Sequence, residues 1–118
     1  MSVGQFVFML HSHLPYYRKA GMWPFGEENL YECMCETYVP LLNAISEVYE
    51  EEGIKAKLTV GITPILAEQL IDEHLKNGFI EYLDSRIKQV SEDLDRYPDP
   101  NVANSQHLKY LAKYYFDW

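Results

Sequence analysis

The chain has 118 residues, of which 47% are hydrophobic and 24% are charged, a composition typical of a soluble globular domain. Ten basic residues against 18 acidic ones give a formal charge of −8. This excess of negative charge argues against nucleic acid or an anionic membrane as a partner, whereas a neutral ligand is compatible with it.

The amino-terminal residues carry no sign of a secretion signal or a membrane anchor. Their one apolar run, Phe6 to Leu10, is far too short to cross a bilayer. We therefore expect a cytoplasmic protein in which Cys33 and Cys35 stay reduced. Two positions apart on a helix, these thiols lie on opposite faces, so they can neither bridge to each other nor share a metal.

The hydrophobic pattern predicts strands and helices in an α/β order. In chain order we expect a strand at 6–10, a long loop at 12–28, a helix at 29–52, a strand at 55–63, and helices at 64–76, 79–96 and 104–118. The run Phe6–Leu10 lacks alternation, which is typical of a strand buried on both faces. Strand–helix–strand order favours parallel pairing, so the predicted class is α/β.

Proline and glycine residues predict where the helices bend or end. Pro40 should start a new helical turn or kink the first helix near Tyr38, and Gly53 should cap its carboxyl end. Thr63 and Pro64 should begin the next helix. Asn77 and Gly78 should end that helix, and the prolines of the YPDPN segment, residues 97–101, should break the chain again.

Two histidines, His11 and His13, stand where the first strand should end, and active sites of α/β barrels gather at the carboxyl ends of strands. One interpretation is structural, with the imidazoles bonding backbone groups. A second is a metal pair, although two ligands are too few for a site and His74 and His107 fall on amphipathic helices. The third is sugar binding, since imidazoles can donate hydrogen bonds to hydroxyl groups.

Aromatic residues crowd the loop beside these histidines: Tyr16, Tyr17, Trp23 and Phe25. Aromatic faces stack on the apolar face of a sugar ring, and such rings with a few polar groups are typical of ligand sites. Some of the rings must pack to hold the loop together. Trp23 is the best candidate for binding, because Gly21 and Pro24 indicate an exposed turn around it.

The motifs HSHLPY, WPFGEE, ETYVPLL and LTVGITPILAEQL resemble the amino terminus of glycoside hydrolase family 57, especially its 1,4-α-glucan branching type. The resemblance implies the first part of a (β/α)7 barrel, so that residues 1–118 would be an N-terminal fragment of the catalytic domain. It implies retaining glycosyl transfer on α-glucans, with a carboxylate nucleophile and a second carboxyl group as acid and base. It implies no cofactor and no metal.

Carried over by motif, His11 and His13 would contact the sugar beside the scissile bond, and Trp23 would line the acceptor side of the cleft, with Tyr16 nearby. The family's nucleophile Glu and acid/base Asp would come from later barrel strands, supplied in cis or by a separate chain. Glu27 and Glu28 are better explained as carboxylates at a helix start, where they favour the helix dipole, and Glu68 falls inside a helix, so none of the three replaces the catalytic pair.

Several functions remain open on the sequence alone. Within the same family the parent could be an α-amylase or a 4-α-glucanotransferase. The chain could also be a non-catalytic carbohydrate-binding or vestigial module, or a metal-dependent hydrolase that uses the HSH motif. Because two strands cannot close a barrel, we expect the isolated chain to leave a sheet edge and apolar surface uncovered. We also expect it to cleave no α-glucan, because the sequence places no pair of carboxyl groups at barrel strand ends.

Overall fold

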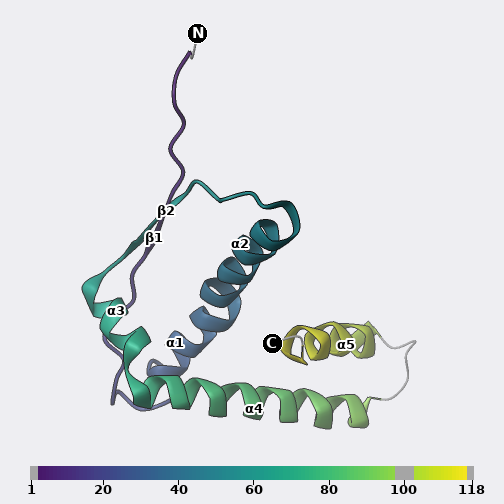
Figure 1. Cartoon of the computed structure of the whole chain (residues 1–118). Helices are drawn as coiled ribbons and strands as arrows, with labels where there is room; N and C mark the ends of the chain where they lie inside the picture. Colours follow the sequence, from purple (N-terminus) through teal and green to yellow (C-terminus); the bar gives the residue numbers. More distant parts are fainter. Residues whose placement is uncertain (1–2, 98–102, 117–118) are drawn as a thin grey trace. The chain divides into compact units, whose positions relative to one another are not determined.

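The computed structural model describes residues 3–97 and 103–116 and divides into two compact units, Met1–Leu75 and Lys76–Trp118. Its elements are β1 Met9–Ser12, α1 Glu27–Cys33, a π-helical turn η1 Met34–Tyr38, α2 Val39–Glu52, β2 Thr59–Ile62, α3 Pro64–Ile71, α4 Glu73–Arg96 and α5 Ala103–Phe116 (Figure 1). Helices therefore dominate, and the α/β order predicted from the sequence is confirmed for the first unit.

The two strands of the first unit lie side by side and parallel, as predicted (Figure 1). Met9 pairs with Thr59 and Ser12 with Ile62. The predicted bounds were wrong, because pairing starts three residues later than the apolar run and covers only four residues of each strand. A strand needs a partner strand beside it. Because β2 begins at Thr59, which pairs with Met9, β1 begins at Met9.

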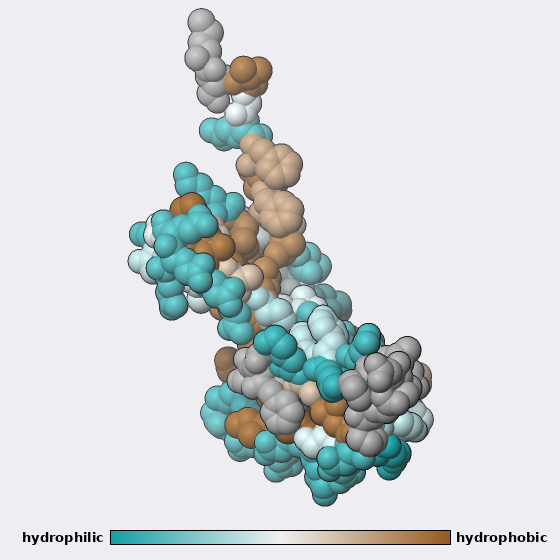
Figure 2. All heavy atoms as spheres, turned by 90° about the vertical axis from the view of Figure 1, so that its right-hand side faces the viewer, coloured by the Kyte–Doolittle hydropathy of each residue, from teal (hydrophilic) through white to brown (hydrophobic). Residues whose placement is uncertain are grey.

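The prediction that the run Phe6–Leu10 is buried on both faces is also wrong for the described residues. Phe6, Val7, Phe8 and Met9 are exposed, and Leu10 is half-buried. Figure 2 shows apolar side chains at the surface along the extended N-terminal segment. This run therefore has the composition of a buried strand without the neighbours that would bury it.

The first long helix begins at Glu27 and ends at Glu52, with the π-helical turn η1 just before Pro40. Proline lacks an N–H, and its ring crowds the carbonyl one turn earlier, so the preceding turn widens. The predicted disturbance near Tyr38 is thus confirmed. So is the glycine cap, because Gly53 adopts φ +66° and its N–H donates to the Tyr49 carbonyl at 3.0 Å.

The predicted break at Asn77 and Gly78 is wrong, because both residues lie inside α4. The chain turns earlier, at Asp72, whose backbone is extended with φ −69° and ψ 123°. The Asp72 carboxylate accepts a hydrogen bond from the Leu75 N–H at 3.1 Å. Asp72 therefore caps α4, and this side-chain cap ends one helix and starts the next more effectively than the Asn-Gly pair.

The core of the first unit is small and lies around α1, η1 and α3. The side chains that are fully buried there are Leu30, Tyr31, Cys35, Leu66, Gln69 and Leu75. Burying one such leucine contributes about 1.5–3 kcal/mol to stability. Cys33 is half-buried and Cys35 buried, and neither forms a disulfide, as expected from their spacing.

The second unit consists of most of α4 together with α5. Tyr82 and Val90 of α4 and Ala112 of α5 are buried, and the Arg86 guanidinium lies 4.8 Å from the centre of the Tyr82 ring. The predicted proline break at 97–101 and the end of the last helix at Trp118 fall largely outside the described residues. No helix in the described ranges is both long and apolar enough to span a membrane.

Candidate functional site

The two strands deliver polar side chains to their carboxyl ends. His13 follows β1 and Thr63 follows β2, and the His13 Nδ1 lies 3.1 Å from the Thr63 Oγ1. The Thr63 N–H also donates to the Ser12 carbonyl at 3.2 Å, which extends the parallel pairing by one residue. Thr63 therefore fixes the His13 ring while the rest of the imidazole stays exposed to solvent.

His11 lies within β1 rather than beyond its end, opposite Gly61 of β2. A Cβ atom at Gly61 would lie 3.4 Å from the His11 Nδ1, so the imidazole occupies space next to the glycine. Since His11 and His13 are two residues apart along an extended chain, their side chains leave the backbone on the same side. Both histidines are exposed, which leaves their imidazoles accessible to a ligand.

The aromatic loop after His13 is anchored to α3 by Gln69, which is only 1% exposed. The Gln69 Oε1 accepts from the Tyr17 N–H at 2.7 Å, and the Gln69 Nε2 donates to the Pro15 carbonyl at 2.9 Å. The Nε2 also lies 3.2 Å from the Ile65 carbonyl within the same helix. One buried amide thus satisfies two peptide groups of a loop that has no strand to pair with.

A second anchor is Glu27 in the first turn of α1, which is 6% exposed. Its carboxylate accepts from the Lys19 N–H at 2.9 Å and the Tyr31 hydroxyl at 3.3 Å, and lies 3.0 Å from the His74 Nε2. Burial raises the pKa of Glu27, but the Lys19 amide, the His74 ring and the Tyr31 hydroxyl outweigh it, so this pKa lies below its ordinary value.

A third anchor is the ion pair between the Arg18 guanidinium and the Asp72 carboxylate. Partial burial raises the pKa of Asp72, but hydrogen bonds from the Leu75 amide and from Arg18 lower it below the ordinary value. Because Asp72 also caps α4, the same carboxylate joins the loop to the start of that helix.

The tip of the loop is a tight turn around Trp23. The Glu27 N–H donates to the Gly21 carbonyl at 2.8 Å and the Glu28 N–H lies 3.3 Å from the Met22 carbonyl oxygen. A Cβ atom at Gly26 would overlap the Gly21 carbonyl, so this close approach requires glycine. The turn presents Trp23 to solvent at 78% exposure.

The structure brings the four predicted ligand-binding residues into one unit and leaves each of them accessible. His11 lies within β1 and His13 just after it, and Tyr16 and Trp23 lie on the anchored loop, where Tyr16 is 57% exposed. Phe25 is also exposed, whereas Tyr17 is half-buried. Exposing large aromatic rings to water is unfavourable, and exposed apolar groups often mark a binding surface. The three anchors described above hold the loop backbone in place although these rings are exposed, as a ligand-binding surface would require.

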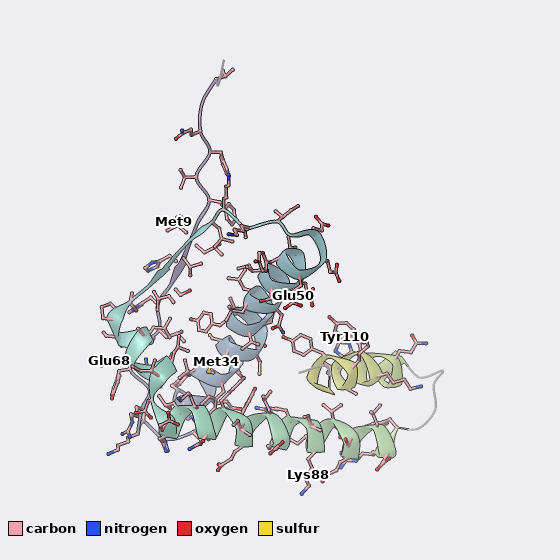
Figure 3. The ribbon with its side chains drawn as sticks, in the orientation of Figure 1. Met9, Met34, Glu50, Glu68, Lys88 and Tyr110 are labelled. Atoms are coloured by element: carbon pink, nitrogen blue, oxygen red, sulfur yellow. The ribbon has the colours of Figure 1, made fainter. Side chains whose placement is uncertain are left out.

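The acidic residues weighed from the sequence take structural positions. Glu68 lies on α3 with its side chain in solvent (Figure 3). Glu28 is half-buried in the first turn of α1, and Glu27 is committed to the loop anchor. His74, expected to be solvated or packed, is half-exposed and bonded to Glu27.

Sequence reasoning missed the three anchors Gln69, Glu27 and the Arg18–Asp72 pair. These anchors join residues about 50 positions apart in the sequence. A local sequence pattern cannot predict which distant residue such a side chain will contact. The one available signal was the polar Gln69 on the otherwise apolar side of the 64–76 helix. Among the residues described, no group of three or more His, Cys, Asp or Glu side chains is arranged to hold a metal ion.

A parallel strand–helix–strand unit with polar and aromatic groups at its strand ends is typical of α/β enzymes. Residues 7–118 match the family model described as glycosyl hydrolase family 57. The chain therefore belongs to glycosyl hydrolase family 57, as the motif resemblance indicated.

Curated relatives of this chain include branching enzymes. It is 43% identical over 115 residues to a 1,4-alpha-glucan branching enzyme of Thermococcus kodakarensis, covering 98% of this chain and 17% of that protein. It is 38% identical over 80 residues to a probable 1,4-alpha-glucan branching enzyme of Mycobacterium tuberculosis, covering 68% of this chain and 15% of that one. The chain thus spans less than a fifth of the length of these relatives.

The chain is also similar to solved structures of family 57 branching enzymes. A GH57-type branching enzyme of Pyrococcus horikoshii superposes with a TM-score of 0.85 at 40% identity, over 94% of this chain and 20% of that one. A GH57 branching enzyme of Thermococcus kodakaraensis, solved in complex with glucose and additives, gives a TM-score of 0.81 at 40% identity, over 94% and 19%. The fold described above is therefore compatible with the N-terminal part of the family 57 fold.

Proposed function

We propose that this chain is the N-terminal segment of a family 57 catalytic barrel that acts on α-glucans, and that the whole protein is a 1,4-α-glucan branching enzyme. The observation that carries the proposal is the identity of 43% to a branching enzyme over 98% of the chain, together with TM-scores above 0.8 to two branching-enzyme structures. The cytoplasmic location expected from the sequence remains a prediction.

In this proposal the accessible groups of the first unit bind sugar. His11 and His13 donate hydrogen bonds to sugar hydroxyls near the scissile bond, while the rings of Trp23 and Tyr16 stack on pyranose faces. Support comes from the exposure of these side chains on an anchored loop and from the contact that orients His13 through Thr63. No cofactor takes part.

The partner that completes the site is the rest of the catalytic domain, in cis or as a separate chain. An apolar cavity of about 130 Å³ opens on the first unit, lined by residues of β1, η1, α2, β2 and α3: Ser12, Tyr38, Leu41, Leu42, Val60, Ile62, Leu66 and Leu70. Further barrel strands and helices would fill this hollow and cover the exposed run Phe6–Met9. The open apolar cavity and the exposed apolar run support the proposal that another part of the protein covers them.

The catalytic carboxylates come from that remainder. Retaining transfer needs a carboxylate to form the glycosyl–enzyme bond and a second carboxyl group to protonate the departing oxygen, before a sugar hydroxyl takes the glycosyl group. Glu27 is occupied by three hydrogen-bonding partners and Glu68 points into solvent on a helix. We therefore expect residues 1–118 alone to release no reducing ends from amylose, and the same to hold for a His11→Ala/His13→Ala control.

The test of the branching assignment is the product formed from linear amylose by the full-length protein that contains this segment. We expect new α-1,6 linkages, counted by a debranching enzyme or by their anomeric NMR signals. Shorter linear chains with new reducing ends would mean an α-amylase. Redistributed linear chains would mean a 4-α-glucanotransferase, and binding without turnover a carbohydrate-binding module. Activity abolished by a chelator would favour the metal-dependent hydrolase.

A further inference from the structure

Gln69 straddles a single residue of the aromatic loop. Its amide oxygen accepts from the N–H of Tyr17 and its amide nitrogen donates to the carbonyl of Pro15, at 2.7 and 2.9 Å. These are the peptide groups on either side of Tyr16. The side-chain amide therefore pairs with the backbone as a neighbouring strand would, and restrains the two dihedral angles that aim the Tyr16 ring.

The amide is buried, whereas the ring it aims is not. Gln69 is 1% exposed and Tyr16 is 57% exposed. A buried primary amide is costly unless its donors and acceptor are satisfied, so an apolar residue would serve a purely packing role on α3 equally well. What Gln69 adds is a fixed backbone conformation at Tyr16.

Local structure elsewhere in the loop does not supply this restraint. The anchors at Glu27 and at the Arg18–Asp72 pair act on residues after Tyr16. The Tyr17 carbonyl accepts from the Ala20 N–H at 2.9 Å, a bond that lies beyond Tyr16, whereas the two peptide groups that flank Tyr16 are bonded to Gln69. Without the bonds to Gln69 the Pro15–Tyr17 peptides would sample other conformations, and the Tyr16 ring would lose its orientation.

We propose that Gln69 is a positioning residue for sugar binding, which acts through the backbone of Tyr16 and makes no contact with the sugar itself. The inference rests on the proposed α-glucan function, and it adds a residue that carries no ligand-binding role of its own. Pre-arranging the ring raises affinity because the ordering of the loop is complete before the sugar arrives.

The test is a double-mutant cycle on affinity for a linear α-1,4 maltooligosaccharide, measured by calorimetry with the full-length protein. Gln69→Met keeps the volume of the side chain and removes all of its hydrogen bonds. We expect it to weaken binding about five- to tenfold, as the loss of one or two net hydrogen bonds allows. In a Tyr16→Ala background the same change should have no further effect, because the ring it aims is gone.

Two further variants serve as a fallback and as a control for the double-mutant cycle. Gln69→Leu also removes all of the side chain's hydrogen bonds without adding a charge, so it should weaken binding as Gln69→Met does, and it replaces Gln69→Met in the cycle if that variant does not fold. Gln89→Met changes a glutamine whose hydrogen bonds stay within α4, to Ser85 and Arg86, and should leave affinity unchanged.

Each outcome decides between the two hypotheses. If wild-type protein binds no maltooligosaccharide, the proposed function fails. If wild type binds but Gln69→Met binds equally well, or weakens binding by the same factor with and without Tyr16, then Gln69 is a core residue and the positioning role is wrong.

Discussion

Glu27 offers the sharpest test of how the loop is held, because one buried carboxylate serves the Lys19 amide, the Tyr31 hydroxyl and the His74 ring. Glu27→Gln keeps the shape but turns one acceptor oxygen into a donor. The Tyr31 hydroxyl or the His74 nitrogen then loses its acceptor, and the bonds that remain lose their charge. A hydrogen bond to a charged group contributes about 1.5–3 kcal/mol, so we expect the loop anchor to weaken by about 1–3 kcal/mol.

Hydrogen exchange measures that loss where it occurs. The Lys19 amide exchanges only when its bond to Glu27 opens, so Glu27→Gln should speed its exchange by roughly 5- to 150-fold at pH 7, the factor that corresponds to about 1–3 kcal/mol. Mass spectrometry of a peptide covering residues 17–21 reports it. Glu68→Gln removes an exposed charge from α3 and serves as the matched control. Unchanged exchange in Glu27→Gln would refute the anchor.

The pH dependence of this effect has a definite sign. The pKa of Glu27 is lower in the folded chain than its ordinary value, so its ionised form stabilises the fold above the unfolded pKa of about 4.3. This stabilisation disappears as the pH falls through the folded pKa. The difference between wild type and Glu27→Gln should therefore be full at neutral pH and shrink below about pH 4.

Three other substitutions test separate parts of the account. Gly26→Ala should destabilise the turn by about 1–3 kcal/mol, seen as a lower melting temperature, because its methyl group would overlap the Gly21 carbonyl. Leu66→Ala should cost about 2–5 kcal/mol in denaturant unfolding, whereas Ile65→Ala, at an exposed position of the same helix, should cost far less. Trp23→Ala in the full-length protein should impair transfer to a sugar acceptor more than cleavage of the donor, by about 1–3 kcal/mol by analogy with base–aromatic stacking; equal losses would make Trp23 a packing residue.

Much of the fold was accessible from the sequence because it depends on local signals. The apolar periodicity, Pro40 and Gly53 located the first long helix, and the strand–helix–strand order predicted the parallel pair. Errors arose where a long-range contact outweighs a local preference. Asn77-Gly78 looks like a helix end, but Asp72 had already ended α3 by capping α4. Phe6–Phe8 looks like a buried strand, but only a neighbour can bury it.

The candidate site shows the same contrast between local signals, which the sequence reveals, and long-range contacts, which it does not. Exposed candidates were recognisable by residue type and local sequence: His13 by its position just after a strand, and Trp23 by the turn-forming Gly21 and Pro24 around it. Residues that hold them in place were not, because Gln69 and Glu27 act through partners that the chain brings close only when folded. The roles of His11, His13, Tyr16 and Trp23 in binding sugar remain predictions.

The most direct test of the central claim is to trap the covalent intermediate of the full-length protein with a slow fluorinated glucosyl fluoride and to map the labelled peptide by mass spectrometry. A retaining enzyme forms a glycosyl ester on its nucleophile, and the fluorine substituent slows its breakdown. The account predicts a label on a carboxylate outside residues 1–118. A label on Glu27, Glu28 or Glu68 would contradict it, because the chain would then carry the nucleophile itself.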